Sequence, residues 1–277
     1  MTTVRHATGG GLEAPGPGHY GLRSLLSSEW IKLTSVRSTV WTLVVTAVAG
    51  VGIGALVTSA EASRFSTRSF AARLAFDPTR SSPSGILFAQ LAIGILGVLV
   101  VSAEYSTGTI RATLSATPRR PMVLAAKVLL FAVVTAVVGE VVSFAAFLLG
   151  QHILSGQAPT ASLSDPTVLR AVVSAGLYLS ALGLLALGLA TIIRHTPAAI
   201  STFVGLLFIL PIIADVLPSS FADDVNRFLP ADIGIQMMSA NYHGADPIGP
   251  WLSFALLAGY AAIALILGGV MLVRRDA

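Results

Sequence analysis

The sequence contains no cysteine and few charged side chains. The absence of cysteine excludes disulfides, thiol catalysis and cysteine-ligated metal sites. Charged residues make up only 11% of the chain, whereas about 25% is usual in soluble proteins. Because 54% of the residues are hydrophobic and the apolar runs extend along the whole chain, composition places the protein in the membrane class. It leaves no room for a separate soluble domain.

Charge is almost absent from six apolar segments of about 20 residues, the length that crosses a lipid bilayer. Lipid offers the backbone no hydrogen-bond partner, so each segment is expected to form a helix. A helical core of a soluble protein would need polar outer faces, and these segments are apolar on all sides. We therefore predict an all-α integral membrane protein with six transmembrane helices: Ser38–Ala60, Ser81–Ala103, Val128–Gly150, Ala171–Ile193, Pro197–Leu217 and Trp251–Val273.

The segment before the first span has two parts. Residues 1–21 are rich in Gly, Pro and Thr and are expected to form a disordered cytoplasmic tail. Between Leu22 and Val36, apolar residues recur at helical spacing, and Glu29 and Lys32 lie among polar residues on the opposite side. This pattern predicts an amphipathic helix in the membrane interface, and a frayed extension of the first span is the alternative. Residues 22–277 then form a single transmembrane domain, with no cleavable signal peptide expected before it.

The distribution of basic residues predicts the orientation of the chain, because Lys and Arg are enriched in cytoplasmic loops. Both termini are therefore expected on the cytoplasmic side of the cell membrane. The basic residues flank apolar segments instead of gathering on one face, so nucleic acid is not an expected partner. The first outer loop departs from the rule with four arginines. With a cytoplasmic N-terminus, 11 of the 17 basic residues lie inside: Arg5, Arg23, Lys32, Arg37, Arg111, Arg119, Arg120, Lys127, Arg194, Arg274 and Arg275.

The longest inner loop joins the second and third spans and reads EYSTGTIRATLSATPRRPMVLAAK, Glu104–Lys127. After Gly108 it can form a short helix that carries Arg111. Pro118 and Pro121 are expected to bracket a basic turn, because proline disfavours helix in the residue before it. A short helix held between two spans can pass motion from a cytoplasmic partner into the membrane. An ordinary inner loop is the alternative, but it does not explain the small, polar run around Gly108.

Three stretches, in this order and spacing, resemble the permease subunit of a type-2 ATP-binding-cassette (ABC) transporter. They are SEWIKLTSVRSTVW, the loop quoted above, and FADDVNRFLPADIGIQ before the last span. The resemblance covers Leu22 to the C-terminus and implies a short cytoplasmic coupling helix. It assigns five residues to the coupling region that docks onto the ATPase subunit: Glu104, Tyr105, Gly108, Thr109 and Arg111.

A P-loop, G-x-x-x-x-G-K-[ST], is missing from the chain. The motif needs a lysine followed by Ser or Thr, whereas Leu33 follows Lys32 and Val128 follows Lys127. The resemblance therefore implies that the ATPase is a separate polypeptide and that this chain is not itself an enzyme. It also implies a dimer, in which a second permease copy or a paralogue completes the pore. No cofactor and no metal are expected.

Glu140 and Asp215 are the two acids inside the predicted spans. Glu140 lies midway along the third span, where a carboxylate costs roughly 2.5 kcal/mol or more and usually faces a bundle interior or a water-filled cavity. It is a candidate for the translocation path, and a packing residue at the dimer seam is the alternative. Asp215 is near the outer interface and is expected to be solvated. Intramembrane catalysis is not expected, since the two acids differ in depth and all histidines fall outside the predicted spans: His6, His19, His152, His195 and His243.

The predicted function is ATP-driven transport of a substrate, with export as the expected direction. A stand-alone secondary transporter or channel is one alternative, although neither paired midplane polar residues nor an inverted repeat favours it. A membrane scaffold that transports nothing is the other. The substrate class stays open, because drug, peptide, lipid and polysaccharide exporters share this architecture.

Overall fold

The computed structural model describes residues 21–110, 120–216, 218–240 and 248–274. Every regular element in these ranges is a helix. Six stretches are long and apolar enough to cross a membrane, which confirms the all-helical prediction with its six apolar helices and indicates a multi-pass membrane protein. Their bounds are Arg37–Phe65, Pro78–Ser106, Arg120–Leu154, Pro166–Ile193, Thr196–Asp215 and Pro250–Arg274.

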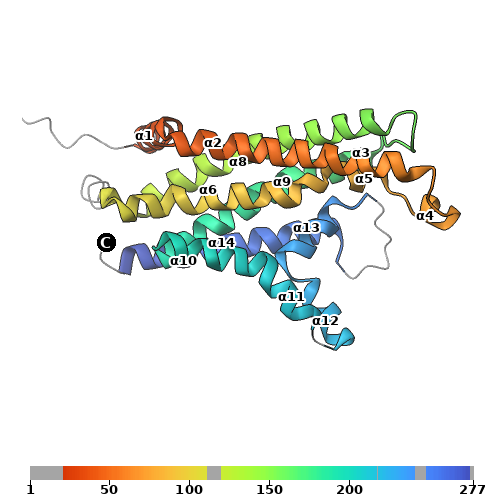
Figure 1. The fold of residues 1–277 in the computed structure, drawn as a ribbon. Helices are drawn as coiled ribbons and strands as arrows, with labels where there is room; N and C mark the ends of the chain where they lie inside the picture. Colours follow the sequence, from red (N-terminus) through yellow and green to blue (C-terminus); the bar gives the residue numbers. More distant parts are fainter. Residues whose placement is uncertain (1–20, 111–119, 217, 241–247, 275–277) are drawn as a thin grey trace, which may run out of the picture.

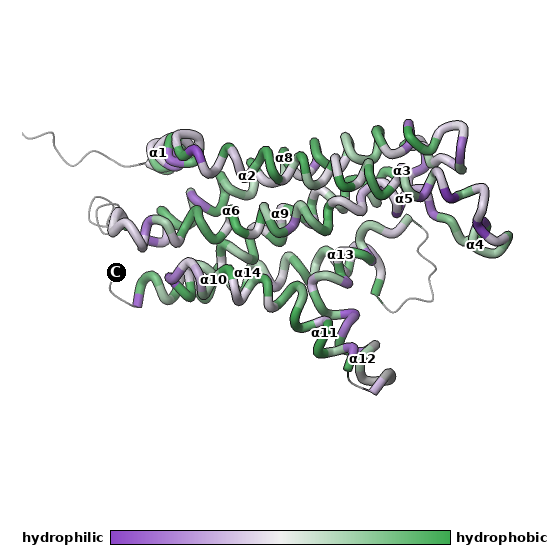
Figure 2. Tube along the Cα trace, viewed as in Figure 1, coloured by the Kyte–Doolittle hydropathy of each residue, from purple (hydrophilic) through white to green (hydrophobic). Residues whose placement is uncertain are grey.

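The six stretches lie roughly side by side (Figure 1), with apolar residues along most of their length and polar residues concentrated towards the two ends (Figure 2). Before them comes α1 (Leu22–Ser35). The stretches are built in chain order from these elements: α2 (Arg37–Ala47), η1 (Val48–Ile53) and α3 (Gly54–Phe65); α5 (Pro78–Ser81), η2 (Ser82–Gly85) and α6 (Ile86–Ser106); α8 (Arg120–Leu154); α9 (Pro166–Ile193); α10 (Thr196–Val204), η3 (Gly205–Ile209) and α11 (Leu210–Asp215); and α14 (Pro250–Arg274).

α9 is the central helix of the bundle. α6, α8 and α14 each pack along it, and most of its residues are buried, among them Tyr178 and Leu182. Small residues allow close approach, since a Cβ atom added to Gly139 of α8 would lie 2.6 Å from the Gly176 carbonyl oxygen of α9. The first and fifth spans lie at the periphery, and few of their side chains are buried within the chain. Apolar side chains in such positions suit contact with lipid or with another chain.

The first span is not a regular α-helix, because its middle turn η1 is π-helical. This turn packs backbone to backbone against the start of the second span. A Cβ atom added to Gly85 would lie 2.8 Å from the Ala49 carbonyl oxygen and 2.7 Å from the Gly54 nitrogen, and it would also overlap the Gly50 carbonyl oxygen. Only a residue without a side chain fits at position 85.

The fifth span also contains a π-helical turn, η3, which ends shortly before Pro211. Proline has no N–H group to donate to the carbonyl oxygen one turn back, and its ring crowds that carbonyl. The wider π-helical turn gives the backbone room for the proline and lets the span continue as α11. π-helical turns are rare, and they are frequent at functional sites.

α8 is longer than predicted at both ends. Pro121 lies in its first turn, where a missing N–H group breaks no helical hydrogen bond. The prediction of a basic turn is therefore wrong for Arg120 and Pro121, while Pro118 lies outside the described residues. His152, predicted to lie outside the spans, is part of the last turn of α8.

The described chain begins and ends at the same end of the bundle (Figure 1). α1 lies across this end, and the last turns of α6 and α14 are found there as well. We call it the α1 end. The opposite end carries α4 (Phe70–Leu74), α12 (Ser219–Asn226) and α13 (Pro230–Met238). Apart from Gly21, the predicted N-terminal tail lies outside the described residues.

Candidate functional site

Four charged side chains meet at the α1 end, where α1, the end of α6 and the start of α8 come together. The Lys127 Nζ atom lies 2.9 Å from Glu104 Oε1 and donates a short hydrogen bond to Glu29 Oε2. The Lys32 Nζ atom lies 2.8 Å from Glu29 Oε1 and 3.0 Å from Glu104 Oε1. Each lysine therefore contacts both acids. We call these four residues the charge cluster.

Apolar packing of α1 positions its two members of the cluster. Leu25, Glu29 and Leu33 are buried and recur every four residues, so they lie on one side of the helix. Leu25 packs against Val123 of α8, one turn before Lys127. Glu29 therefore faces into the bundle, and the prediction that it belongs to the polar side of α1 is wrong. The interfacial position of α1 stays a prediction.

Burial makes the pairing of these charges necessary. Glu29 and Lys127 are each only 5% exposed, and an unpaired charge at such a position costs several kcal/mol. Lys127 also donates to the Val100 carbonyl oxygen at 3.4 Å, so its three N–H groups have three acceptors. Lys32 is partly exposed. Burial lowers the pKa of Lys32, but hydrogen bonds and charge attraction from Glu29 and Glu104 outweigh this, so its pKa lies above the ordinary value and the ammonium stays charged at neutral pH.

Tyr105 connects the end of the second span to two other spans. The Arg194 guanidinium lies over its ring, 5.3 Å from the ring centroid. Arg194 ends α9 with a left-handed backbone conformation and donates a 2.8 Å hydrogen bond to the Met271 carbonyl oxygen of α14. Ile110 and Leu272 pack beside Tyr105. Motion at the end of α6 would therefore reach α9 and α14.

The chain leaves α6 through a turn at Gly108, whose φ of 71° is in the left-handed region that glycine adopts without strain. The hydroxyl oxygens of Thr107 and Thr109 lie 2.9 Å apart beside this turn. Thr109 and Ile110 are helical, but Arg111 and the rest of the predicted coupling helix lie outside the described residues. Four of the five predicted coupling residues are found together at the α1 end: Glu104, Tyr105, Gly108 and Thr109.

Glu29, Lys32 and Lys127 carry no motif that marks them as site residues in the sequence. Lys127 has the position of an ordinary topology charge. One signal is visible in retrospect, because Lys32 and Lys127 are the chain's two lysines among 17 basic residues. A compact ammonium group can lie between two carboxylates, whereas the planar guanidinium of arginine prefers paired, fork-like contacts.

Glu140, the candidate for the translocation path, packs where α8 crosses α9. A Cβ atom added to Gly176 would lie 2.6 Å from the Glu140 carboxyl carbon. The Glu140 Oε2 atom is buried and has no hydrogen-bond partner in the described part of the chain. Glu140 lines none of four cavities found among the described residues. This geometry favours a packing role between α8 and α9 within the bundle, while the translocation path and the dimer seam stay predictions.

Glu140→Gln is expected to raise the free energy of unfolding in mild detergent by about 1 kcal/mol. The change keeps the size of the side chain and removes the negative charge of a half-buried carboxylate whose Oε2 atom is buried without a partner. Thermal unfolding followed by circular dichroism measures the effect. Glu61→Gln is the control. The Glu61 carboxylate accepts a hydrogen bond from the Ser81 hydroxyl, so Glu61→Gln should lower stability slightly. A clear loss of stability in Glu140→Gln would contradict the packing interpretation.

Comparison of the sequence with protein-family models and with curated proteins finds no match. Among the residues that the structure describes, no three His, Asp or Glu side chains are grouped so that they could hold a metal ion. The expectation that the chain carries no metal or cofactor stays a prediction. The candidate site is therefore defined by the buried charge cluster and by the three helices that it joins.

Proposed function

We propose that this chain is the membrane-spanning permease subunit of an ABC transporter and that a separate ATPase subunit supplies the energy. In this proposal the α1 end faces the cytoplasm, so both termini and the loop between α6 and α8 lie on the inner side of the cell membrane. α1 lies in the membrane interface, and export is the direction of transport. The six apolar helices support the membrane assignment, and the sequence resemblance supports the transporter class.

The observation that carries the proposal is the position of the charge cluster directly beside the loop between α6 and α8. Glu104 lies near the end of α6 and Lys127 near the start of α8, and the two are joined by a 2.9 Å ion pair. A docked subunit that pushed on the loop would move both helices together with α1, because separating them would leave buried charges unpaired. A rigid connection of this kind suits the transmission of force from a cytoplasmic motor.

The partners in this proposal are an ABC ATPase subunit and a second permease, either another copy of this chain or a paralogue. The lack of a P-loop in this sequence requires the first. Peripheral apolar surface on the first and fifth spans is compatible with the second. ATP hydrolysis is assigned to the partner, so this chain itself is proposed to be non-enzymatic.

A stand-alone secondary transporter or channel is the second candidate function. Such a protein needs polar groups along a path through the middle of the bundle. Glu140, the deep acid of the third span, packs against Gly176 and lines none of the described cavities. A scaffold that transports nothing is a third candidate, but it would not need a buried ionic connection beside a loop. No observation favours either one over the ABC assignment.

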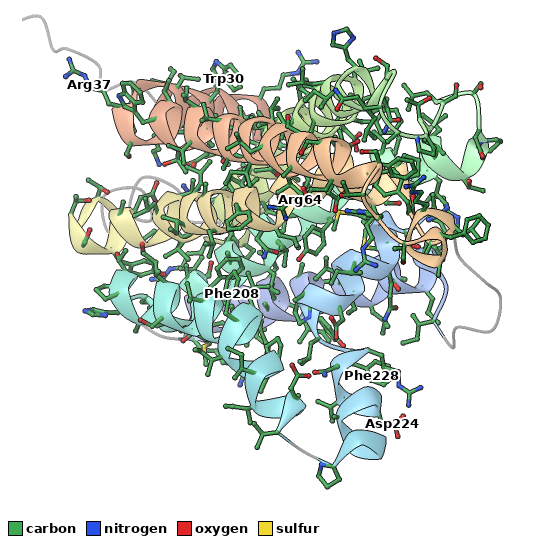
Figure 3. The ribbon with its side chains drawn as sticks, turned by 45° about the vertical axis from the view of Figure 1, so that its right-hand side comes forward. Trp30, Arg37, Arg64, Phe208, Asp224 and Phe228 are labelled. Atoms are coloured by element: carbon green, nitrogen blue, oxygen red, sulfur yellow. The ribbon has the colours of Figure 1, made fainter. Side chains whose placement is uncertain are left out.

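Arg111→Glu is expected to reduce ATP hydrolysis by the co-purified ATPase roughly tenfold, which corresponds to about 1.4 kcal/mol. A reversed charge in the docking loop weakens an electrostatically matched contact. The chain is isolated with its partner by affinity purification in mild detergent, and phosphate release is measured. Arg64→Glu makes the same change on an exposed residue of α3, away from the α1 end, and should leave hydrolysis unchanged (Figure 3).

Two outcomes would count against the proposed function or against the proposed contact of Arg111. Reproducible recovery of the chain without any P-loop protein would contradict the transporter assignment as a whole. Unchanged hydrolysis in Arg111→Glu, with a partner present, would remove only that residue from the proposed contact. Membrane insertion of both variants is checked by carbonate extraction.

A further inference from the structure

A cavity of about 440 Å³ lies beside the charge cluster, between α1, the start of α2 and α6. Its size is within the range of about 300–1,000 Å³ that is typical of small-molecule sites. Most of its wall area is apolar, and polar residues of α1, α2, α6 and α8 also line it. Such a cavity suits an amphipathic ligand. The apolar residues of the wall include Leu33, Val36, Leu96, Leu99 and Val100.

The start of α2 gives the polar side of this cavity a positive potential. α2 begins at Arg37, and the residue before it, Val36, has no side-chain group that can cap the helix. The helix dipole places partial positive charge at the first turn of a helix, where N–H groups lack partners within the helix; in α2 the Thr39 N–H already donates to the Val36 carbonyl oxygen at 3.0 Å. Ser38 and Thr39 belong to this first turn and line the cavity. The position is therefore suited to an anion.

Thr39 provides an independent sign that a ligand binds here. Its side chain is only 6% exposed, yet its hydroxyl makes no hydrogen bond within the described part of the chain. By contrast, the hydroxyl of Thr46, two turns further along the same span, donates to the Thr42 carbonyl oxygen at 2.8 Å. The Thr39 hydroxyl oxygen is not one of the fully buried atoms without a partner, and Thr39 lines the cavity, so a ligand there can reach it. A ligand in the cavity would supply a hydrogen-bond partner for Thr39.

The charged residues of the cavity wall balance, two lysines against two acids, so an anion would be attracted by the start of α2 and by the remaining donor of Lys32. Glu29 and Glu104 also line the cavity and are paired with the two lysines; both ion pairs of Glu104 use Oε1, and its Oε2 atom is buried without a hydrogen-bond partner in the described part of the chain. Lys32 directs two of its three N–H groups to these acids and is partly exposed, so one donor is left for a ligand. Arg37 stands at the same end and extends outward from the helices, as does Trp30 (Figure 3). Arg37 therefore adds positive charge at the rim and not in the cavity.

We propose that this cavity binds one anionic phospholipid. Its phosphate lies at the first turn of α2, in reach of the Thr39 hydroxyl and Lys32, and an acyl chain lies against Leu96, Leu99 and Val100. Anionic lipids are abundant in cytoplasmic leaflets, where basic residues attract them. The lipid would fill the space between α1, α2 and α6 and thereby support the charge cluster. The inference rests on the cytoplasmic orientation of the α1 end that is part of the proposed function, but it does not depend on transport or on an ATPase partner.

Native mass spectrometry of the full chain, titrated with phosphatidylglycerol or phosphatidylcholine of the same acyl chains, tests this site. The unaltered protein should bind phosphatidylglycerol more tightly. Thr39→Val keeps the side-chain volume and should weaken that binding about tenfold, as expected for one hydrogen bond to a charged group. Thr42→Val is the control on the same helix, because Thr42 does not line the cavity, and should leave binding unchanged.

Leu99→Trp tests the apolar part of the cavity by filling it and should weaken phosphatidylglycerol binding as well. Circular dichroism and gel filtration establish that each variant is folded, and Leu99→Phe replaces Leu99→Trp if the larger residue prevents folding. Equal affinity for the two lipids would overturn the proposal, and so would unchanged binding in both Thr39→Val and the Leu99 variant. Displacement of the lipid by inorganic phosphate would show a simple anion site and would also overturn it.

Discussion

Lys127→Ala is expected to lower the free energy of unfolding by about 3–5 kcal/mol, the range for removing one partner of a buried ion pair. The change leaves Glu29 without its closest cation at a position that is only 5% exposed. It also opens the 2.9 Å contact between α6 and α8. Chemical denaturation in mild detergent, followed by tryptophan fluorescence, measures the loss. A loss below about 1 kcal/mol would show that the cluster is not a buried ionic connection.

Two further variants separate charge pairing from other effects of this change. Lys32→Ala removes the partly exposed lysine and should cost less than about 1 kcal/mol, since solvent screens that pair. Replacing Lys127 with Met together with Glu29→Gln and Glu104→Gln removes the buried charges jointly, which is often close to neutral for stability. If the proposed function is correct, this folded triple variant should still lose partner-stimulated ATP hydrolysis. Normal hydrolysis in it would separate the cluster from coupling.

Gly85→Ala is expected to destabilise the protein by about 3 kcal/mol, the upper end for adding one methyl group to a packed site. The new Cβ atom would lie 2.7 Å from the Gly54 nitrogen and 2.8 Å from the Ala49 carbonyl oxygen. Both are backbone atoms, so no side chain can rotate to relieve the overlap. The first two spans would have to move apart at η1. Thermal unfolding in the same detergent measures the change.

Gly52→Ala is the matched control, because it adds the same methyl group within η1 at a position where the new Cβ atom would have no neighbour within 4 Å apart from the backbone of its own helical turn. It should leave stability unchanged or raise it by up to about 1 kcal/mol, since alanine loses less backbone entropy in a helix than glycine does. Equal destabilisation by the two substitutions would mean that η1 tolerates no side chain for reasons other than contact with the second span. Wild-type stability in Gly85→Ala would contradict the close packing itself.

Part of the candidate site could be predicted from the sequence. The rest could not, because it depends on contacts between residues that are far apart in the chain. The resemblance to a permease assigned Glu104 to the predicted coupling region, and the residue is found in the charge cluster, while its coupling role stays a prediction. Glu29 was predicted on the polar side of α1, because hydropathy alone assigns a carboxylate to water. Its burial depends on Lys127, which is 98 residues away in the chain. No local sequence pattern shows that two residues so far apart in the chain will pair.

The π-helical turns of the first and fifth spans likewise could not be predicted from the sequence. Composition predicts that Ser38–Ala60 and Pro197–Leu217 are helical, because lipid demands that each backbone group bond within its own segment. It does not predict that η1 and η3 are π-helical. The first depends on the approach of Gly85 from another helix, and the second adjoins Pro211, so even a visible proline did not specify the type of turn.

By itself, the sequence determined that the chain is helical, how many apolar helices it has and roughly where they lie, because the cost of placing a residue in lipid is set residue by residue. The tertiary structure decided which charges are buried and which lie at the surface. Pairing energy depends on distance in space, and the three helices that bring the lysines and acids within 3.0 Å of each other do so only once they are packed.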